Sequence, residues 1–294
     1  MTASSTDPAV APSAASSADA ARAPTADRLI AASPLPRTEA RRLLEQASGR
    51  RREWLLAHGD DPLSLNVSEC FLALESRRLN GEPLAYLCGE REFYGLTLKV
   101  DRAVLIPRPE TELLVDAACE RAPAGATVLD LGTGSGAIAI AIAVTRTDLR
   151  VVATDRSGDA LAVAARNAAH HQLAPSRLGF RAGSWWQAVA PAERFELVLS
   201  NPPYIADTDP HLAKGDLRFE PRNALASGSD GLDALREIAA GAPAHLAAGG
   251  WLMVEHGWDQ GAAVRSLFLS AGLEDVHTQP DLAGHERLTL GRAR

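Results

Sequence analysis

The residues with the most specific chemistry form a tetrapeptide, Asn201-Pro202-Pro203-Tyr204, directly after an apolar run that predicts a strand. Asn, two Pro and an aromatic residue in this order should arise by chance at about one position in 10⁵. The side-chain oxygen of Asn201 and the backbone carbonyl of Pro202 can each accept one hydrogen of an NH₂ group, and Tyr204 can stack on a flat amide or base. Two acceptors would align a planar nitrogen and favour positive charge on it. The pattern therefore predicts methyl transfer to such a nitrogen, the alternative being a rigid turn.

A glycine-rich loop, Asp130-Leu131-Gly132-Thr133-Gly134-Ser135-Gly136, lies between a predicted strand and a predicted helix. Glycines let the backbone approach a ligand closely, and the free amides of a helix start favour a polar or anionic group. Asp155 stands at the end of the next predicted strand, where a carboxylate can accept hydrogen bonds from both hydroxyls of a ribose. Together these features predict a nucleoside cofactor, although a short glycine motif can also be a tight turn.

The spacing of the loop separates two kinds of nucleoside cofactor. Dinucleotides are bound by G-x-G-x-x-G, whereas this chain has G-x-G-x-G with Asp130 two residues before the first glycine. S-adenosylmethionine has no pyrophosphate, and Asp130 could engage its ammonium group directly or through water. The loop therefore favours S-adenosylmethionine, which would leave as S-adenosylhomocysteine.

The pattern of apolar residues divides the chain into four parts. Residues 1–28 are dominated by Ala, Ser, Thr and Pro, so a disordered tail is expected. Residues 29–88 repeat apolar positions at helical spacing and predict a small all-helical domain. Residues 89–109 alternate apolar and polar positions and predict a β-hairpin linker. Residues 110–294 follow with alternating strand and helix patterns.

The fourth part predicts an α/β fold. We expect strands at 127–131, 151–154, 195–200, 251–255 and 287–290, and helices at 137–144, 159–171, 233–246 and 264–271. Such alternation is typical of a mostly parallel sheet covered by helices on both faces. Ligands bind such sheets at the carboxyl ends of the strands, where the glycine loop, Asp155 and Asn201 all fall.

Composition, charge and motif spacing argue against several classes of protein. The net charge of −7, from 30 basic and 37 acidic residues, argues against a free-standing nucleic-acid binder. The cysteines Cys70, Cys88 and Cys119 form no C-x-x-C pair, and the eight histidines show no H-E-x-x-H spacing, so we expect no metal. No apolar run approaches 18 residues and no signal peptide is evident, so a cytoplasmic protein without membrane contact is expected.

These features together resemble the release factor glutamine methyltransferases, the HemK or PrmC family of protein-(glutamine-N5) methyltransferases. The resemblance covers about residues 36–291. The matching stretches are Gly81-Glu82-Pro83-Leu84-Ala85-Tyr86, Arg91-Glu92-Phe93-Tyr94, Leu105-Ile106-Pro107-Arg108-Pro109-Glu110-Thr111-Glu112, the glycine loop, Ser200 to Ile205, Arg218-Phe219-Glu220-Pro221 and Glu255-His256-Gly257. The resemblance implies a Rossmann-like class I S-adenosylmethionine-dependent methyltransferase domain behind a helical N-terminal domain.

The resemblance also implies roles for individual residues. It places S-adenosylmethionine against residues 132–136, Asp155, Ser184 and Trp185, with Asn201 between cofactor and substrate. The substrate glutamine would lie on residues 201–204. Many members carry Asp where this chain has Ser184, whose hydroxyl is a weaker acceptor for the adenine amino group, so cofactor affinity is expected to be lower unless a neighbour such as Trp186 compensates.

The resemblance names the partner as class I peptide-chain release factors, methylated on the glutamine of their Gly-Gly-Gln loop. The N-terminal domain would help to dock that protein, and a monomer is expected. Arg108 either borders the substrate pocket or forms a surface salt bridge.

Three other functions stay open. A ribosomal-protein glutamine methyltransferase would use the same chemistry. A methyltransferase acting on adenine or guanine amino groups would need a basic channel, and the Arg50 to Arg52 run is more typical of a solvated helix start. A non-catalytic module would not require Asn201, Pro202 and Tyr204 together.

Overall fold

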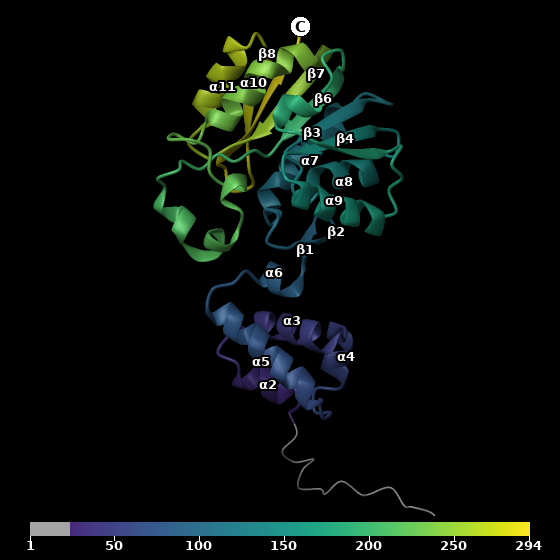
Figure 1. Ribbon diagram of the computed structural model, residues 1–294, viewed down its shortest axis with the longest axis vertical. Coiled ribbons are helices and arrows are strands. Elements are labelled where there is room, and N and C mark those ends of the chain that lie inside the picture. The colour runs from purple at the N-terminus through teal and green to yellow at the C-terminus, as the bar shows by residue number, and fades with distance from the viewer. Residues whose placement is uncertain (1–23) are drawn as a thin grey trace, which may run out of the picture. The chain divides into compact units, whose positions relative to one another are not determined.

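The computed structural model describes residues 24–294, which fall into two compact units that divide between Cys88 and Gly89 (Figure 1). Most of the expected tail, residues 1–28, lies outside the described residues. For its last residues the expectation is wrong, because helix α2 begins at Ala26. The Thr25 side chain accepts from the backbone N–H of Arg28, and Ala26 is only 1% exposed, so these residues belong to a packed helix.

The first unit is helical, in keeping with the periodic apolar pattern. Its core contains Leu43 and Leu44 from α3 and Phe71 from α5, all nearly inaccessible to solvent. Helix α5 starts where Ser64 accepts from the backbone N–H of Val67. The helices are α2 (Ala26–Ala32), α3 (Arg37–Ser48), α4 (Arg52–Ala57), α5 (Leu65–Leu79) and α6 (Leu84–Cys88).

The second unit, residues 89–294, is built on a seven-stranded sheet in the order β5-β4-β3-β6-β7-β9-β8. Strands β3 to β7 pair in parallel, and β9 pairs antiparallel with both β7 and β8. The strands are β3 (Thr127–Leu131), β4 (Arg150–Asp155), β5 (Leu178–Ala182), β6 (Phe195–Ser200), β7 (Leu246–Glu255), β8 (Glu274–Pro280) and β9 (Glu286–Arg292). The expected Rossmann-like α/β fold is confirmed.

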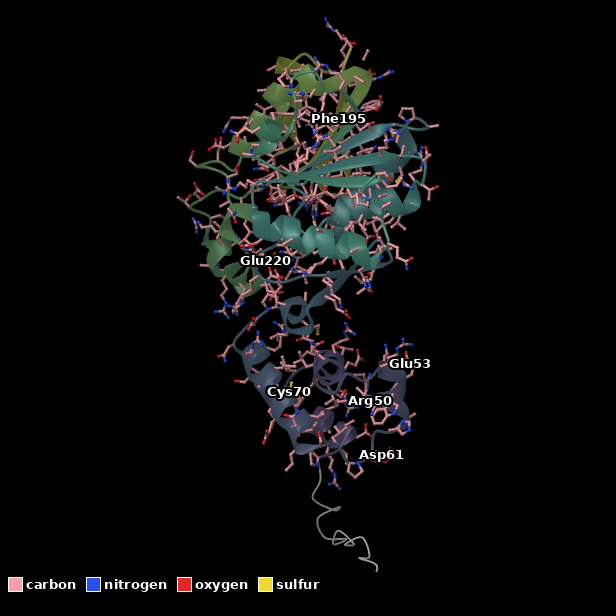
Figure 2. The ribbon with its side chains drawn as sticks, turned by 45° about the vertical axis from the view of Figure 1, so that its right-hand side comes forward. Arg50, Glu53, Asp61, Cys70, Phe195 and Glu220 are labelled. Carbon is pink, nitrogen blue, oxygen red and sulfur yellow. The ribbon has the colours of Figure 1, made fainter. Side chains whose placement is uncertain are left out.

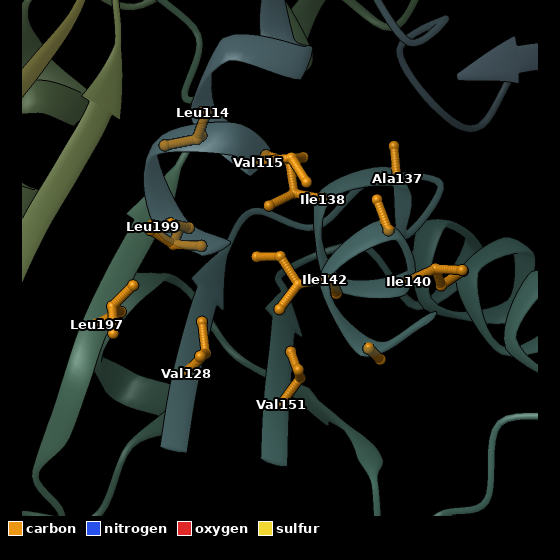
Figure 3. Packing of buried hydrophobic residues seen from close by; sticks show 14 of the residues in the cluster. Leu114, Val115, Val128, Ala137, Ile138, Ile140, Ile142, Val151, Leu197 and Leu199 are labelled. Carbon is orange, nitrogen blue, oxygen red and sulfur yellow. The ribbon is translucent and has the colours of Figure 1, made fainter. Parts of the chain in front are cut away.

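Helices cover both faces of this sheet, as alternation along a strand requires. Val128 of β3 packs on the face covered by α7 (Glu112–Arg121), α8 (Ala137–Thr145) and α9 (Gly158–His170), and Figure 3 shows it facing Ile138 and Ile142. Its neighbours Leu129 and Leu131 pack on the opposite face, which α10 (Asp233–His245) and α11 (Gly261–Ser270) cover. The first seven residues of helix α8, from Ala137 to Ala143, are all buried, and none of them is polar.

The antiparallel hairpin of β1 (Glu90–Phe93) and β2 (Leu96–Lys99) is part of the second unit and not a free linker. Phe93 and Leu98 are buried in the same core as α8. Asn167 of α9 joins the hairpin to the glycine loop, because its amide nitrogen donates to the carbonyls of Lys99 and Ser135, both at 2.9 Å. Its oxygen accepts from the Lys99 N–H at 2.7 Å.

Two strands, β5 and β8, were not expected from the sequence. Both are edge strands of the sheet, and their residues are mostly half-buried or exposed, so neither shows the apolar run of a central strand. Strand β7 also begins at Leu246, five residues before the expected start at Trp251, because two glycines interrupt its apolar pattern.

Candidate active site

A cavity of about 330 Å³ opens at the carboxyl ends of the central strands of the second unit. Its lining brings together the loop after β3, Asp155 at the end of β4, Ser184 and Trp185 after β5, and Asn201 after β6. The topology therefore collects four sequence-predicted segments in one place, as the rule for parallel sheets requires.

The glycine loop exposes backbone to this cavity. Gly134 has a φ of 56° and a Cβ built there would meet no atom within 4 Å, so no side chain separates the loop from the cavity. Gly136 has a φ of 84° and caps α8; a Cβ there would lie 2.9 Å from the Ile140 Cδ1 atom and 3.2 Å from the Ala164 Cβ atom. Glycine is required at Gly136 for both its conformation and its contact with α9.

Asp155 lies where its carboxylate could accept a hydrogen bond from a ligand hydroxyl. Its Oδ2 atom accepts from the Gly134 N–H at 2.9 Å and its Oδ1 atom from the Ser157 N–H at 2.9 Å. Each carboxylate oxygen has a further lone pair, and the residue lines the cavity. The carboxylate is thus held in place with acceptor capacity left for a ribose.

Asp130 is fully buried and does not line the cavity. Its Oδ2 atom accepts from the Thr133 hydroxyl at 2.6 Å, while its Oδ1 atom has no hydrogen-bond partner. Burial raises the pKa of Asp130 to about 7, although the Thr133 hydrogen bond opposes this shift and the charge of Asp155 adds to it. The expected direct contact with a ligand ammonium group is therefore not supported, because the side chain lies behind the loop and bonds to it.

Trp185 supplies a flat apolar surface to the cavity. Its backbone has a φ of 46°, which is uncommon for a bulky residue, and its ring lies close to Gly132, where a Cβ would be 3.2 Å from the Trp185 Cζ3 atom. Ser184 also lines the cavity. Trp186 does not; its indole N–H donates to the Glu237 carbonyl at 3.1 Å and its ring stacks on His245, so it is not placed to compensate for Ser184.

The tetrapeptide after β6 is divided between the cavity and the protein interior. Asn201 and Pro203 line the cavity, whereas Pro202 and Tyr204 do not. The Tyr204 hydroxyl donates to the Glu255 Oε1 atom at 3.2 Å, and its carbonyl accepts from the Gln260 amide at 3.0 Å. The described cavity therefore offers the Asn201 amide to a ligand, while the Tyr204 ring, expected to stack on one, is bonded into the wall behind it.

Arg108 borders the cavity, and the ion pair that it forms is made to a buried carboxylate and not at the surface. The partner of its guanidinium is Glu220, whose side chain is completely buried. Figure 2 marks Glu220 in the second unit. The other oxygen of Glu220 accepts from the backbone N–H of Ile106 at 3.1 Å. The pair fixes the segment before α7 against the loop that follows the tetrapeptide.

Two residues that the sequence did not single out complete the site. Asn201 donates from its Nδ2 atom to the Thr111 hydroxyl oxygen at 3.0 Å, and Thr111 donates to the Glu255 Oε2 atom at 2.6 Å. Burial raises the pKa of Glu255 to about 7, against the opposing effects of Thr111, Tyr204 and the nearby charge of Arg287. Thr111 and Glu255 both fall in stretches that carry the family resemblance. That resemblance is the only feature of the sequence by which these two residues could have been found.

The described part of the chain shows two further absences. Within residues 24–294, no three His, Cys, Asp or Glu side chains gather as a metal-binding group would. Over the same residues, none of the helices is long and apolar enough to cross a bilayer.

The cavity's residues fit the cofactor that the glycine spacing favours. Exposed loop backbone suits a polar chain, Asp155 suits a pair of ribose hydroxyls, and Trp185 suits a flat base. The fit rests on the donor and acceptor chemistry of these side chains.

Two family models match the chain. The model of the PrmC N-terminal domain matches residues 20–89, and the model of the methyltransferase small domain matches residues 109–220. The first spans the helical unit, and the second spans the glycine loop, Asp155 and the tetrapeptide.

Curated relatives cover nearly the whole chain. A release factor glutamine methyltransferase of Xylella fastidiosa (strain Temecula1) is 54% identical over 260 residues, which are 88% of this chain and 94% of that protein. Its counterpart in Escherichia coli (strain K12) is 46% identical over 264 residues, which are 90% and 94% of the two chains. Among solved structures, a methyltransferase from Pyrococcus furiosus shares the fold, with a TM-score of 0.52 at 17% identity over 74% of this chain and 96% of that one.

Proposed function

Because the chain belongs to the family of release factor glutamine methyltransferases, we propose that it methylates the side-chain amide nitrogen, N5, of the glutamine in the Gly-Gly-Gln motif of class I peptide-chain release factors. The observation that carries the proposal is the orientation of Asn201. Its NH₂ group donates to Thr111, which leaves its oxygen free at the cavity that the glycine loop and Asp155 also line. A free amide oxygen is the acceptor that a substrate NH₂ group needs.

The proposed methyl donor is S-adenosylmethionine. When bound, it supplies a methyl group on a positively charged sulfur, and transfer to nitrogen breaks the sulfur–carbon bond, forms a nitrogen–carbon bond and leaves S-adenosylhomocysteine. The residues that would hold it are the loop from Gly132 to Gly136, Asp155, Ser184 and Trp185. Asp155 would accept from the ribose hydroxyls, and the Trp185 ring would cover the base.

The residues around Asn201 would make an unreactive nitrogen reactive. The lone pair of an amide nitrogen is delocalised into the carbonyl, so the nitrogen needs alignment and stabilisation of developing positive charge. The Asn201 oxygen would accept one amide hydrogen and hold the nitrogen in line with the methyl group, whereas Pro202, which the sequence suggested as the second acceptor, does not line the cavity. As the nitrogen gains charge its protons become acidic, and one is released to water or through the Asn201 carbonyl.

The proposal is tested by incubating the full chain with methyl-labelled S-adenosylmethionine and four acceptors in parallel. These are a class I release factor, the same factor with the glutamine of its Gly-Gly-Gln motif replaced, a ribosomal protein, and RNA or DNA. Label is expected only on the first, and mass spectrometry should place it on the glutamine amide. Label on the ribosomal protein or on nucleic acid alone would overturn the proposal in favour of those substrates.

A further inference from the structure

A continuous chain of hydrogen bonds runs from the cavity to a buried carboxyl group. Asn201 donates to Thr111 at 3.0 Å, Thr111 donates to one oxygen of Glu255 at 2.6 Å, and Tyr204 donates to the other oxygen at 3.2 Å. Thr111 is 4% exposed and Glu255 is 2% exposed. Asn201 and Thr111 line the cavity, but the bond between Thr111 and Glu255 joins two buried residues, so the donor and acceptor roles at that bond are set within the protein.

The direction of these bonds follows from counting hydrogens. A carboxylate can only accept, so the single hydrogen of the Thr111 hydroxyl goes to Glu255. The Thr111 oxygen can then only accept a hydrogen bond from Asn201. The donor must therefore be the NH₂ group of the Asn201 amide. If the amide were turned by 180°, two oxygens would face each other without a hydrogen between them. The arrangement therefore directs the Asn201 oxygen to the cavity.

We propose that Thr111 and Glu255 are positioning residues, which hold the Asn201 carboxamide with its oxygen toward the substrate nitrogen, and that this orientation requires an acceptor oxygen at position 255, which Glu255 supplies when it is ionised. The proposal rests on the proposed function, since it assumes that the Asn201 oxygen accepts from the substrate amide. It adds two residues and a charge state to the chemistry assigned to the tetrapeptide.

Protonation of Glu255 would reverse the chain of bonds. A carboxylic acid could donate to Thr111, whose hydroxyl would then donate to Asn201 and draw the amide oxygen away from the cavity. The NH₂ group of Asn201 would face the NH₂ group of the substrate, and two donors form no hydrogen bond. Transfer is therefore expected to fall as Glu255 takes up a proton.

The groups around Glu255 place this change near neutral pH. Burial and the nearby charge of Glu110 raise its pKa, the bonds from Thr111 and Tyr204 and the charge of Arg287 lower it, and the net result is a pKa of about 7. These groups come from the segment before α7, the segment after β6 and strand β9. His256 directly follows Glu255, the last residue of β7. Burial lowers the pKa of His256, so its ring does not place a positive charge beside Glu255 near neutral pH.

The first test compares Thr111→Val, which keeps the shape but loses the hydroxyl, with Thr111→Ser, which keeps the hydroxyl. At saturating cofactor and release factor, Thr111→Val should lower kcat roughly 10- to 100-fold, while Thr111→Ser should stay within about threefold of wild type. Cofactor affinity by calorimetry should change little in either. Thr278→Val, which removes a hydrogen-bonded hydroxyl on β8 outside the cavity lining, is the matched control and should keep wild-type kcat.

The second test is the pH profile of kcat between pH 6 and 9. Wild type should lose activity below an ionisation near pH 7, and Glu255→Gln, whose amide oxygen can still accept from Thr111, should retain activity without that ionisation. Full kcat in Thr111→Val, equal losses in Thr111→Val and Thr111→Ser, or an unchanged profile in Glu255→Gln would each overturn the proposal.

A spectroscopic measurement that does not depend on turnover tests this proposal independently of the proposed function. The side-chain NH₂ signals of Asn201 in ¹H–¹⁵N spectra should shift on raising the pH through 7 in wild type and not in Thr111→Val. If wild type methylates no release factor but these signals behave as expected, the proposed function fails and the positioning role stands. If the signals ignore both pH and Thr111, the positioning role fails.

Discussion

The backbone N–H of Gly134 donates to the Oδ2 atom of Asp155 at 2.9 Å. The acid after β4 is thus bonded to the loop after β3, and both line the same cavity. One carboxylate therefore shapes the loop and offers its remaining lone pairs to a ligand. Because of this double role, substitution of Asp155 should affect cofactor affinity, whereas substitution of Asn201 should affect turnover.

Asp155→Ala should weaken S-adenosylmethionine binding roughly 10- to 100-fold, because it removes charged acceptors from the ribose and an acceptor from Gly134. Isothermal titration calorimetry measures this directly. Asp159→Ala, which removes an exposed carboxylate on the neighbouring helix, is the control and should bind normally. Unchanged affinity in Asp155→Ala would remove that residue from the cofactor site.

Asn201→Ala should reduce kcat by roughly two to three orders of magnitude, comparable to loss of an oxyanion-type contact. Cofactor affinity should stay nearly intact, because the loop, Asp155 and Trp185 are untouched. Steady-state kinetics on a release factor, paired with calorimetry, distinguishes the two effects. Equal losses of affinity and turnover would instead assign Asn201 to cofactor binding.

Gly136→Ala should lower the free energy of unfolding by about 1–3 kcal/mol, because its φ of 84° disfavours a side chain and the new Cβ would crowd Ile140 and Ala164. Gly134→Ala carries the same kind of φ but meets no neighbour within 4 Å, so it should cost only about 1 kcal/mol. Urea unfolding of both variants gives the comparison. A larger loss for Gly134→Ala would contradict the assigned packing.

Stability should fall between pH 6 and pH 8, and Asp130 should account for part of the fall. Its folded pKa is raised to about 7 from 3.8, so the folded protein holds a proton that the unfolded chain has already lost, and that advantage disappears as pH rises through 7. One such group contributes a loss of about 1.4 kcal/mol over this interval. Urea unfolding at the two pH values should show a smaller loss in Asp130→Asn.

Glu255 has a pKa raised to about 7 as well, and it contributes equally in wild type and Asp130→Asn. The difference between the two proteins therefore isolates Asp130. An identical fall in both would mean that Asp130 is ionised in the folded protein throughout this range.

Local sequence was sufficient for the parts of the site that lie within one segment. The glycine loop and the tetrapeptide each follow a buried strand, and the topology of a parallel sheet brings them together without further information. Edge strands β5 and β8 could not be read in this way, because half-solvated strands lack a continuous apolar pattern. The start of α2 was also missed, since Ala26 to Arg28 resemble the Ala-rich residues before them.

The direction in which a side chain points is the other property that could not be predicted from the sequence. The sequence placed Asp130 at the right position in the chain, but only the structure shows that its carboxylate lies behind the loop. Asn201, Thr111 and Glu255 are far apart in sequence, and their hydrogen bonds depend on three elements meeting. Spacing along the chain holds no information about such a meeting.

The Asn167 bridge makes the hairpin of β1 and β2 more than a spacer. One amide holds the Lys99 backbone and the Ser135 carbonyl at once, so a displacement of the hairpin would pull on the glycine loop. Lengthening or shortening the hairpin in an engineered chain should thus change the affinity of the glycine loop for a nucleoside.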